Sequence, residues 1–455
     1  MSLVIYLALL AALVAVARHT PGRAMVMVYL PVLLLLPDTY HAITPGLPDP
    51  SFNQAALLPI IAVAALRYGT QWRPSVADVL VIGFTASVAY SEYLAAGYAE
   101  AQNLIFTMLT GALAPYLVAR WCIARERLHV PVARTFAGLL FGLAVFGLFE
   151  AKMGFNPFHA AIERFFPGQG GWVTTFRHGL ARVAGPYSHA ILAGIMMVMA
   201  YRIQRWLEWG GHWEPRFTRL ALPWPKARLM TIGLFIGCIM TVARGPWLGG
   251  VAGAMFALIG RAKNKKRALI SMVGAAVFIG GPAVFAFFSY LDVKPGETMT
   301  MSQESAVYRK VLMEKYADIA LDHAWLGWGR NTWPKVGGME SIDNYYLLLS
   351  LMHGLLSTGL LVAVMLWLMA RLLIQGLKEP AGHNSLSLCL MGTIASVLVS
   401  LVTVYLGENV LPAFFFILGW AEGFLQDPAS DPGLTPAKGS TTPAGMGLRF
   451  RRVIG

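Results

Sequence analysis

The stretch LMTIGLFIGCIMTVARGPWLGGVAGAMFALIG, residues 229–260, contains two apolar runs separated only by Arg-Gly-Pro at 244–246. Each run approaches the length of a membrane-spanning helix, which is roughly 17–25 residues. A connection this short holds Arg244 at the boundary of the membrane, where an arginine is costly unless it is paired or hydrated. The stretch therefore predicts a helical hairpin in a membrane with an arginine at its tip.

The whole composition agrees with this prediction. Of 455 residues, 56% are hydrophobic and only 13% are charged, whereas soluble globular proteins carry about 25% charged residues. The sequence predicts an all-α polytopic membrane protein with about 12–13 transmembrane helices. The predicted spans lie near residues 2–17, 24–37, 54–66, 76–91, 103–122, 135–150, 186–201, 229–243, 246–260, 268–290, 343–374, 385–405 and 410–425.

The distribution of lysine and arginine predicts the orientation of these spans. One set of connections holds 25 of the 36 basic residues, and this side is expected to be cytoplasmic. The connections of this set are residues 18–23, 67–75, 120–134, 202–228, 261–267, 371–384 and 427–455. Thirteen spans place the N-terminus outside; if the first run is not a span, twelve remain and both ends lie inside. The net charge of +13 is then explained by topology and by anionic lipid, without nucleic acid.

We predict one integral membrane domain over residues 1–426, with external loops at about 151–185 and 291–342. The second loop contains a helical pattern, so the external region is partly helical. Residues 427–455 are rich in Pro, Gly and Thr and predict a disordered basic cytoplasmic tail. The three cysteines lie in or beside spans and support neither a disulfide framework nor a metal site. We expect no cofactor.

The external connections contain the candidate site residues. Arg182 precedes a Gly-Pro turn and a helix start, where proline fits the first turn and free amides favour an anion. The alternative is an interfacial arginine that meets lipid headgroups. His189 follows in the same helical turn, and a packed, hydrogen-bonded role is its main alternative. Arg244 suits forked binding of phosphate oxygens, or a structural pair with a carboxylate such as Glu408 or Glu150.

A helix is predicted within ESAVYRKVLMEKYADIALDHAWLGWG, residues 304–329. Arg309 falls on the same stripe as Met313 and Tyr316, because these positions are four and seven residues later. Lys310 falls on the outer face with the acidic residues, where ion pairs are ordinary surface features. We therefore expect Arg309, and not Lys310, to contact a ligand.

Asp343 and Asn344 stand at the start of the span near 343–374 and are followed by Tyr345. Asp and Asn are preferred helix N-caps, and tyrosine is common at membrane interfaces, so a structural role is the alternative. A carboxylate at the boundary that carries the arginines is also placed to act as a general base. Glu150 and Glu408 are rival candidates for that role.

Together these motifs resemble the O-antigen ligase and Wzy-type polysaccharide polymerase superfamily. The hairpin motif Ser/Thr-Arg-Gly-x-Trp-Leu-Gly is matched by residues 243–249, with Ala243 at the first position. The pattern R-x-x-G-P-F/Y-x-H-x-x-x-A/L-G is matched by residues 182–194, and a PLLGWG-like run by residues 324–329. The resemblance covers roughly residues 60–425 and depends on the order and spacing of the motifs.

The resemblance implies a GT-C-like glycosyltransferase in the bacterial inner membrane, with its active site facing the periplasm. The implied reaction is an inverting, metal-independent polymerisation of undecaprenyl-pyrophosphate-linked repeat units. Asp343, Arg244 and Arg309 are the implied catalytic residues, where both arginines bind the pyrophosphate and Asp343 is the base. The substrate contacts are expected from Arg182, His189, Asn344, Tyr345, Glu150 and Glu408.

The implied partners are the lipid-linked glycan donor, a glycan acceptor, membrane lipid, and a chain-length regulator or export machinery. Ligases of the superfamily carry a His-Asn pair where this chain has Asp343–Asn344, which favours an exopolysaccharide or O-antigen polymerase. An O-antigen ligase that transfers the glycan to lipid A core or another acceptor is the first alternative. A transporter of lipid-linked oligosaccharide is the second, although the sequence shows no internal repeat.

Overall fold

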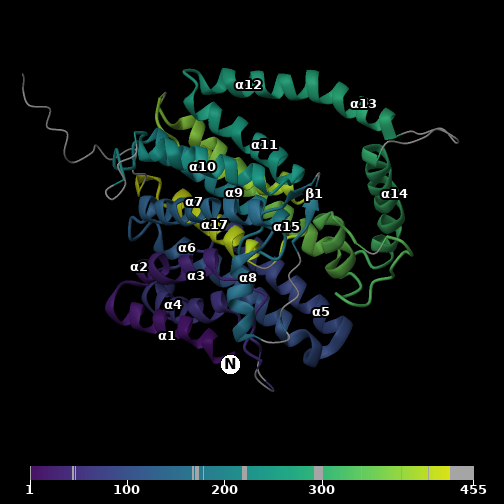
Figure 1. Ribbon diagram of the computed structural model, residues 1–455, viewed down its shortest axis with the longest axis horizontal. Helices are drawn as coiled ribbons and strands as arrows, with labels where there is room; N and C mark the ends of the chain where they lie inside the picture. Colours follow the sequence, from purple (N-terminus) through teal and green to yellow (C-terminus); the bar gives the residue numbers. More distant parts are fainter. Residues whose placement is uncertain are drawn as a thin grey trace, which may run out of the picture.

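The computed structural model describes residues 2–43, 46, 48–166, 169, 174–177, 179–217, 223–291, 301–339, 341–380, 382–407 and 409–430. The regular structure of these residues is helical except for one antiparallel pair of two-residue strands (Figure 1). The helices are α1 (Ile5–Arg18), α2 (Pro21–Ala24), α3 (Leu30–Leu35), α4 (Phe52–Tyr68), α5 (Val76–Met108), α6 (Ala114–Cys122), α7 (His129–Met153), α8 (Pro157–Ile162), α9 (Ala190–Trp209), α10 (Lys226–Met240), α11 (Arg244–Arg261), α12 (Lys265–Ala275), α13 (Gly281–Leu291), α14 (Met301–Asp322), α15 (Tyr345–Lys378), α16 (Leu386–Ser400) and α17 (Val410–Gln426); the strands are β1 (Phe176–Arg177) and β2 (Leu180–Ala181).

Each predicted span coincides with a helix or with one arm of a helix. Short π-helical turns join α2 to α3, α5 to α6, and α12 to α13, so these pairs are continuous. The span predicted at 385–405 was too long, because α16 ends at Ser400 and a loop follows. The helix predicted within residues 304–329 is observed as α14; its place outside the membrane stays a prediction. The predicted tail lies outside the described residues from 431 onward.

The protein is an all-α membrane protein by the length and hydropathy of its helices. Four helical segments of the described chain are long and apolar enough to cross a bilayer: Phe52–Gln71, Val76–Cys122, His129–Met153 and Tyr345–Lys378. The shorter apolar helices Ile5–Arg18, Pro21–Leu35, Leu386–Ser400 and Val410–Gln426 accompany them. The total of 12–13 spans stays a prediction.

The segment from α5 to α6 is a helical hairpin. Gly97 has φ 76° and ψ 173° and breaks the helix. Near the far ends of the two arms, Asp78 pairs with Arg120 (2.9 Å) and accepts a hydrogen bond from Tyr116 (2.7 Å). The two arms are therefore antiparallel, which explains why the sequence shows two apolar runs here.

Helix α15 is also broken by a glycine. Gly354 has φ 79° and ψ 171°, and the hydroxyls of Ser350 and Thr358 are only 2.9 Å apart across the break. In a straight helix, residues eight apart are separated by about 12 Å along the axis. A short arm, residues 345–353, therefore bends sharply against a long arm, residues 355–378.

The Trp-rich run after α14 docks on this break. Trp328 and Gly329 donate their amides to the carbonyls of Leu351 and Met352 (2.8 Å each), and Leu355 donates to Ala324 (2.6 Å). The break leaves backbone groups of α15 without their helical partners, and the docked run satisfies them. Further along, Arg330 pairs with Glu92 of α5 (3.1 Å), which ties the run to the tip of the α5 hairpin.

Helix α11 packs on α16 through a stripe of glycines. A Cβ at Gly245 would collide with the hydroxyl of Thr403, and one at Gly249 or Gly253 would collide with groups of Ser396. Small residues every fourth position let two membrane helices approach at backbone distance. This packing holds the N-terminus of α11 against the loop that follows α16.

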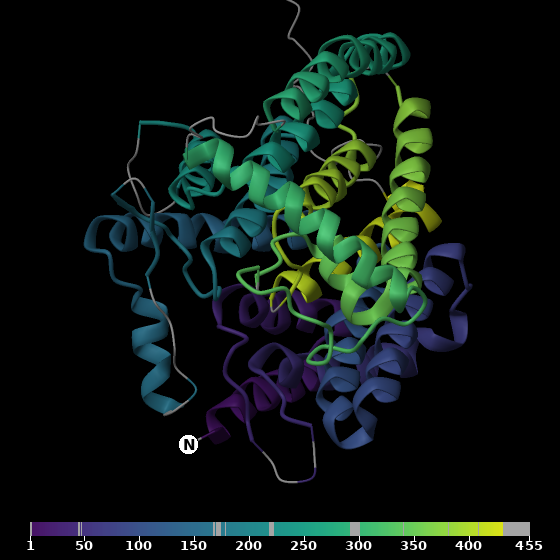
Figure 2. The same ribbon diagram turned by 90° about the vertical axis from the view of Figure 1, so that its right-hand side faces the viewer.

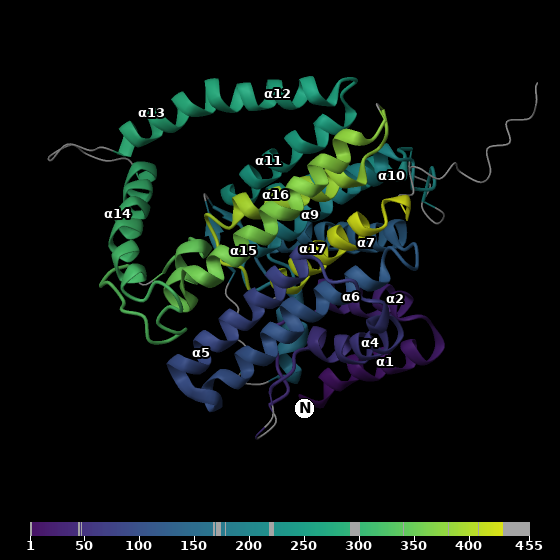
Figure 3. The ribbon, with the colours of Figure 1, turned by 180° about the vertical axis from the view of Figure 1, so that it is seen from behind.

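Helices α12 and α13 run end to end along one edge of the molecule, and α14 turns back from them toward the short arm of α15 (Figures 1 and 3). In Figure 2 the side that carries α14 faces the viewer. A small apolar cluster holds α14 in place. It contains Leu312, Tyr316, Ala320, Trp333, Ile342 and Leu351.

The break in α15 predicts a stability difference between two glycines of the same helix. A Cβ at Gly354 would collide with the backbone of Trp325 and would occupy a positive φ. Gly354→Ala should therefore lower the melting temperature of the purified protein in detergent. Gly359→Ala is the matched control, since a Cβ there meets nothing within 4 Å and alanine favours a helix by up to about 1 kcal/mol. Equal melting temperatures for the two variants would contradict the described break.

Candidate functional site

Two arginines from the loop before α9 support the hairpin between α10 and α11. Arg182 donates from Nε to the carbonyl of Thr241 (3.2 Å), and Arg177 donates from Nη1 to the carbonyl of Val242 (3.3 Å). The amide of Val183 also donates to Met240 (3.1 Å). The predicted motifs at 182–194 and 243–249 therefore lie side by side.

Arg182 is only 7% exposed, and its Nη2 has no hydrogen-bond partner among the described residues. Burial lowers the pKa of its guanidinium, and the nearby charge of Arg177 lowers that pKa further. Arginine remains protonated in proteins. A buried positive group with an unused donor favours an anionic acceptor.

The turn that carries Arg244 is strained. Val242 has φ 46°, which is rare for a β-branched residue, and its carbonyl is the one that Arg177 holds. Ala243 is the N-cap of α11 and provides no side-chain cap. Arg244 follows at the first helical position and is exposed. Within the described chain its guanidinium makes no ion pair or hydrogen bond, so it is open to a ligand.

Arg309 of α14 faces the start of α15. Its Nη2 lies 4.0 Å from Oδ2 of Asp343, and the two side chains are 54% and 58% exposed. Asn344 caps α15 by accepting from the amides of Tyr346 (3.0 Å) and Leu347 (3.3 Å). Of this Asp-Asn pair, Asn344 is therefore the N-cap. The carboxylate of Asp343 is not used to cap the helix.

His189 lies near both groups of charges. It is the N-cap of α9, and its Nδ1 accepts the amide of Ile191 (3.1 Å). Burial and the charge of Arg182 lower the pKa of His189, whereas the charge of Asp343 opposes them. His189 thus lies within electrostatic reach of both the Arg182 loop and the start of α15.

The loop after α16, residues 401–405, contacts three of the segments that carry the predicted residues. The carbonyl of Leu401 accepts the amide of Tyr345 (2.9 Å). Thr403 lies against Gly245, which follows Arg244. The hydroxyl of Tyr405 lies 3.3 Å from that of Ser188. The structure therefore brings together the starts of α9, α11 and α15.

Tyr345 and Glu150 are buried, at 9% and 1% exposure. Glu150 accepts hydrogen bonds from the amides of Ala184 (3.1 Å) and Gly185 (3.0 Å) and from Asn156 (3.0 Å). Its carboxylate therefore holds the loop that follows Arg182. Glu408 lies outside the described residues. The substrate contacts of these three residues stay predictions.

The sequence reasoning overlooked Arg177, Ser188 and Tyr405. Arg177 belongs to the strand pair, in which it is paired with Leu180. Gly179, with φ 75°, forms part of the turn, and this glycine in a mostly polar stretch was the available signal for a turn. Ser188 and Tyr405 meet only in the folded chain and had no comparable local signal.

Part of the chain is similar to a known protein family. Residues 229–362 match the family model Wzy_C, described as O-antigen ligase. The matched segment begins in α10 and ends in α15, so it includes Arg244, Arg309 and Asp343. It confirms the resemblance to the O-antigen ligase and Wzy-type superfamily and supports a glycosyl-transfer enzyme of the ligase or polymerase type. No curated protein matches the chain.

The lowered pKa of His189 predicts a pH dependence of stability. Unfolding restores its ordinary pKa of about 6.5, so the unfolded chain binds a proton that the folded chain does not. The contribution of His189 is then complete above that pKa and is lost as the pH falls below it. His189→Asn keeps a preferred N-cap residue but does not titrate.

We therefore expect the melting temperature to fall less between pH 7.5 and pH 5.5 in His189→Asn than in the unmodified protein. The measurement is thermal unfolding in detergent at several pH values. If both proteins lose the same amount, the neutral state assigned to His189 is wrong.

Proposed function

We propose that the protein polymerises lipid-linked oligosaccharide repeat units by inverting, metal-independent glycosyl transfer. The donor is an undecaprenyl-pyrophosphate-linked glycan, and the acceptor is a second glycan. The observation that supports this best is the meeting of the Arg244 and Asp343 segments at the loop after α16, together with the Arg309–Asp343 pair. All three residues lie within the segment that matches the family.

Arg244 and Arg309 bind the pyrophosphate. Both guanidinium groups are exposed, and each can fork onto phosphate oxygens with two parallel hydrogen bonds. As the anomeric bond breaks, negative charge grows on the leaving pyrophosphate, and fixed donors stabilise it. One such donor contributes about 3–4 kcal/mol in comparable sites. Arg182 adds its positive charge nearby, and its Nη2 has no partner among the described residues.

Asp343 acts as the general base. Its ion pair with Arg309 is long and exposed, and such pairs contribute less than about 1 kcal/mol. A pyrophosphate that binds here can therefore replace Asp343 as the partner of Arg309, which leaves the carboxylate of Asp343 free. Asp343 then accepts the proton of the acceptor hydroxyl, whose oxygen bonds to the anomeric carbon from the face opposite the pyrophosphate. The bond to the pyrophosphate oxygen breaks, and its electron pair leaves with the pyrophosphate.

The polymerase is favoured over a ligase because the chain has Asp343 where ligases of the superfamily carry histidine. We further propose a GT-C-like architecture in the bacterial inner membrane, with this site on the periplasmic side. The orientation is supported by the basic residues that gather at the other end of α5, α6 and α15, where Arg73, Arg120 and Arg371 lie.

Arg244→Lys tests the forked contact. Lysine keeps the charge but not the planar pair of donors, and a hydrogen bond to a charged group contributes about 1.5–3 kcal/mol. Elongation of a lipid-linked repeat unit should therefore fall about tenfold or more. Arg164→Lys is the matched control, because Arg164 is an exposed arginine of the short helical segment after α8 and should leave elongation unchanged. Polymer of normal length from Arg244→Lys would contradict the assigned role.

Asp343→Asn tests the base. The variant keeps the size of the side chain and leaves the cap of Asn344 intact, but it cannot accept the proton. We expect elongation to become too slow to measure while the melting temperature is unchanged. Efficient polymerisation by this variant would mean that Glu150 or Glu408 is the general base, or that the protein provides no base.

A single incubation separates the three functions. Purified protein is supplied with lipid-linked repeat unit alone, and the products are separated by size. A ladder of longer lipid-linked products is the expected result. Reaction only after addition of lipid A core would indicate the ligase, and movement between leaflets without new bonds would indicate the transporter.

A further inference from the structure

A second polar site lies far from the proposed catalytic residues. A cavity of about 500 Å³ is bounded by the turn after α4, the end of α6 and the end of α17. Asp78 lies beside this cavity, and Glu92, the partner of Arg330, lies on the same arm of α5 near α14. The two residues are fourteen positions apart, which is roughly 20 Å along a helix. The cavity therefore opens at the opposite end of the protein, which the lysine and arginine distribution predicts to be cytoplasmic.

Arg120 of α6 lines this cavity. It is 4% exposed, and its Nη2 pairs with Asp78 (2.9 Å) and donates to the carbonyl of Arg73 (2.7 Å). Its Nε, however, is buried and has no hydrogen-bond partner among the described residues. A guanidinium nitrogen can only donate, so what this atom requires is an acceptor.

Trp121, the next residue, has the same requirement. It is 6% exposed, and its indole Nε1 is also buried without a partner in the described part of the chain. The indole N–H is likewise a donor only. Buried polar groups are nearly always hydrogen-bonded. Two unused donors from neighbouring residues that line one cavity therefore indicate a ligand that carries acceptors.

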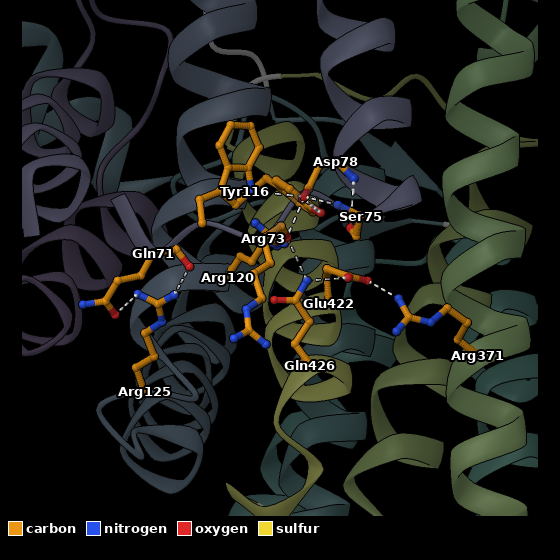
Figure 4. Close-up of polar contacts among 11 residues, drawn as sticks. Gln71, Arg73, Ser75, Asp78, Tyr116, Arg120, Arg125, Arg371, Glu422 and Gln426 are labelled. Carbon is orange, nitrogen blue, oxygen red and sulfur yellow. Dashed lines mark hydrogen bonds and ion pairs between the residues drawn. The ribbon is translucent and has the colours of Figure 1, made fainter. Parts of the chain in front are cut away.

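The charges around the cavity favour an anion. Figure 4 shows Arg73, Arg120 and Gln426 between Arg125 with Gln71 on one side and Glu422 with Arg371 on the other. Arg125 donates to the carbonyls of Tyr68 and Gln71 and to the side chain of Gln71. Among the described residues, neither Arg73 nor Arg125 forms an ion pair.

The acidic groups near the cavity leave this balance positive. Asp78 neutralises Arg120 and also accepts from Tyr116, Trp72 and the amide of Ser75. Glu422 pairs with Arg371 (2.7 Å) and accepts from Gln426 (3.1 Å). Asp427 lines the cavity and is exposed.

We propose that this cavity binds a phosphate group through Arg120 Nε, Trp121 Nε1 and the guanidinium of Arg73. The volume exceeds by far the roughly 10–15 Å³ that one water needs. Leu66 and Val79, on the adjoining helices, are 83% and 64% exposed, as expected for side chains that face lipid. The cavity thus lies at a membrane boundary, where the phosphate of an anionic phospholipid and a soluble phosphate both have access. The site is independent of the proposed glycosyl transfer.

Trp121→Phe tests the site, because it removes an N–H that has no partner among the described residues and keeps an aromatic ring at this position. Arg73→Gln is the second variant, since the side chain of Arg73 is exposed. Arg67→Gln is the matched control: it removes an exposed charge from the same end of the protein, outside the cavity. Thermal unfolding without added ligand confirms that each variant is folded.

Two probes distinguish the source of the phosphate. Phosphatidylglycerol and phosphatidylcholine are titrated into delipidated full-length protein in nonionic detergent, and bound lipid is measured by native mass spectrometry. Inorganic phosphate is titrated separately, and the melting temperature is followed. We expect phosphatidylglycerol to bind more tightly than phosphatidylcholine, and Trp121→Phe and Arg73→Gln each to weaken it about tenfold, the effect of one charge-assisted hydrogen bond.

Arg67→Gln should bind phosphatidylglycerol like the unmodified protein. If only inorganic phosphate binds, and the same two variants weaken it, the site takes its phosphate from solution and the proposal still holds. If Trp121→Phe and Arg73→Gln bind both probes as tightly as the unmodified protein, or if neither probe binds, the proposal is overturned.

Discussion

The close approach of α11 to α16 determines where the proposed site can form. Three glycines at 245, 249 and 253 let the two helices meet at backbone distance, and any side chain there would collide with α16 or with the loop after it. This contact places Gly245, the residue after Arg244, against Thr403. The same loop binds the amide of Tyr345 through Leu401 and contacts Ser188 through Tyr405. One packing contact therefore gathers helix starts that are far apart in the sequence.

The arginines around this loop have different tasks. Arg182 and Arg177 use donors on the carbonyls of Thr241 and Val242, and so hold a turn in which Val242 has a positive φ. Arg244 follows this turn, and its guanidinium has no partner among the residues that the structure describes. Arg309 reaches the same end of the protein from α14, and among the described residues its partner is the exposed Asp343. Arginines that fix the backbone, beside exposed arginines that fix nothing, suit the proposed binding of a diphosphate.

Much of the fold could be predicted from sequence, because apolar runs of membrane length depend only on local composition. The helical segments, the helix α14 and the hairpin at Arg244 were all predicted. The break in α15 was not predicted, since Gly354 and Gly359 look alike in sequence and only the docked run around Trp325 distinguishes them. For the same reason the sequence left Glu150 as a rival base without its backbone contacts. Its role in holding Ala184 and Gly185 depends on a loop that lies more than thirty residues away along the chain.

The second cavity was also missed from sequence, where Arg120 was counted only among the basic residues of the connection 120–134. The unused donors of Arg120 and Trp121 became visible only when α17 and the turn after α4 enclosed them. The position of an arginine in the fold, and not its residue type, thus shows whether its donors are used within the protein or are left for a ligand.

The central claim is that Arg244 and Arg309 bind one diphosphate. The most direct measurement is a structure of the full-length protein with undecaprenyl pyrophosphate, determined by electron cryomicroscopy in nanodiscs. The account predicts density for the diphosphate within hydrogen-bonding distance of both guanidinium groups, with Asp343 released from Arg309. Diphosphate density that contacts neither arginine, or only one of them while the Arg309–Asp343 pair stays closed, would contradict it.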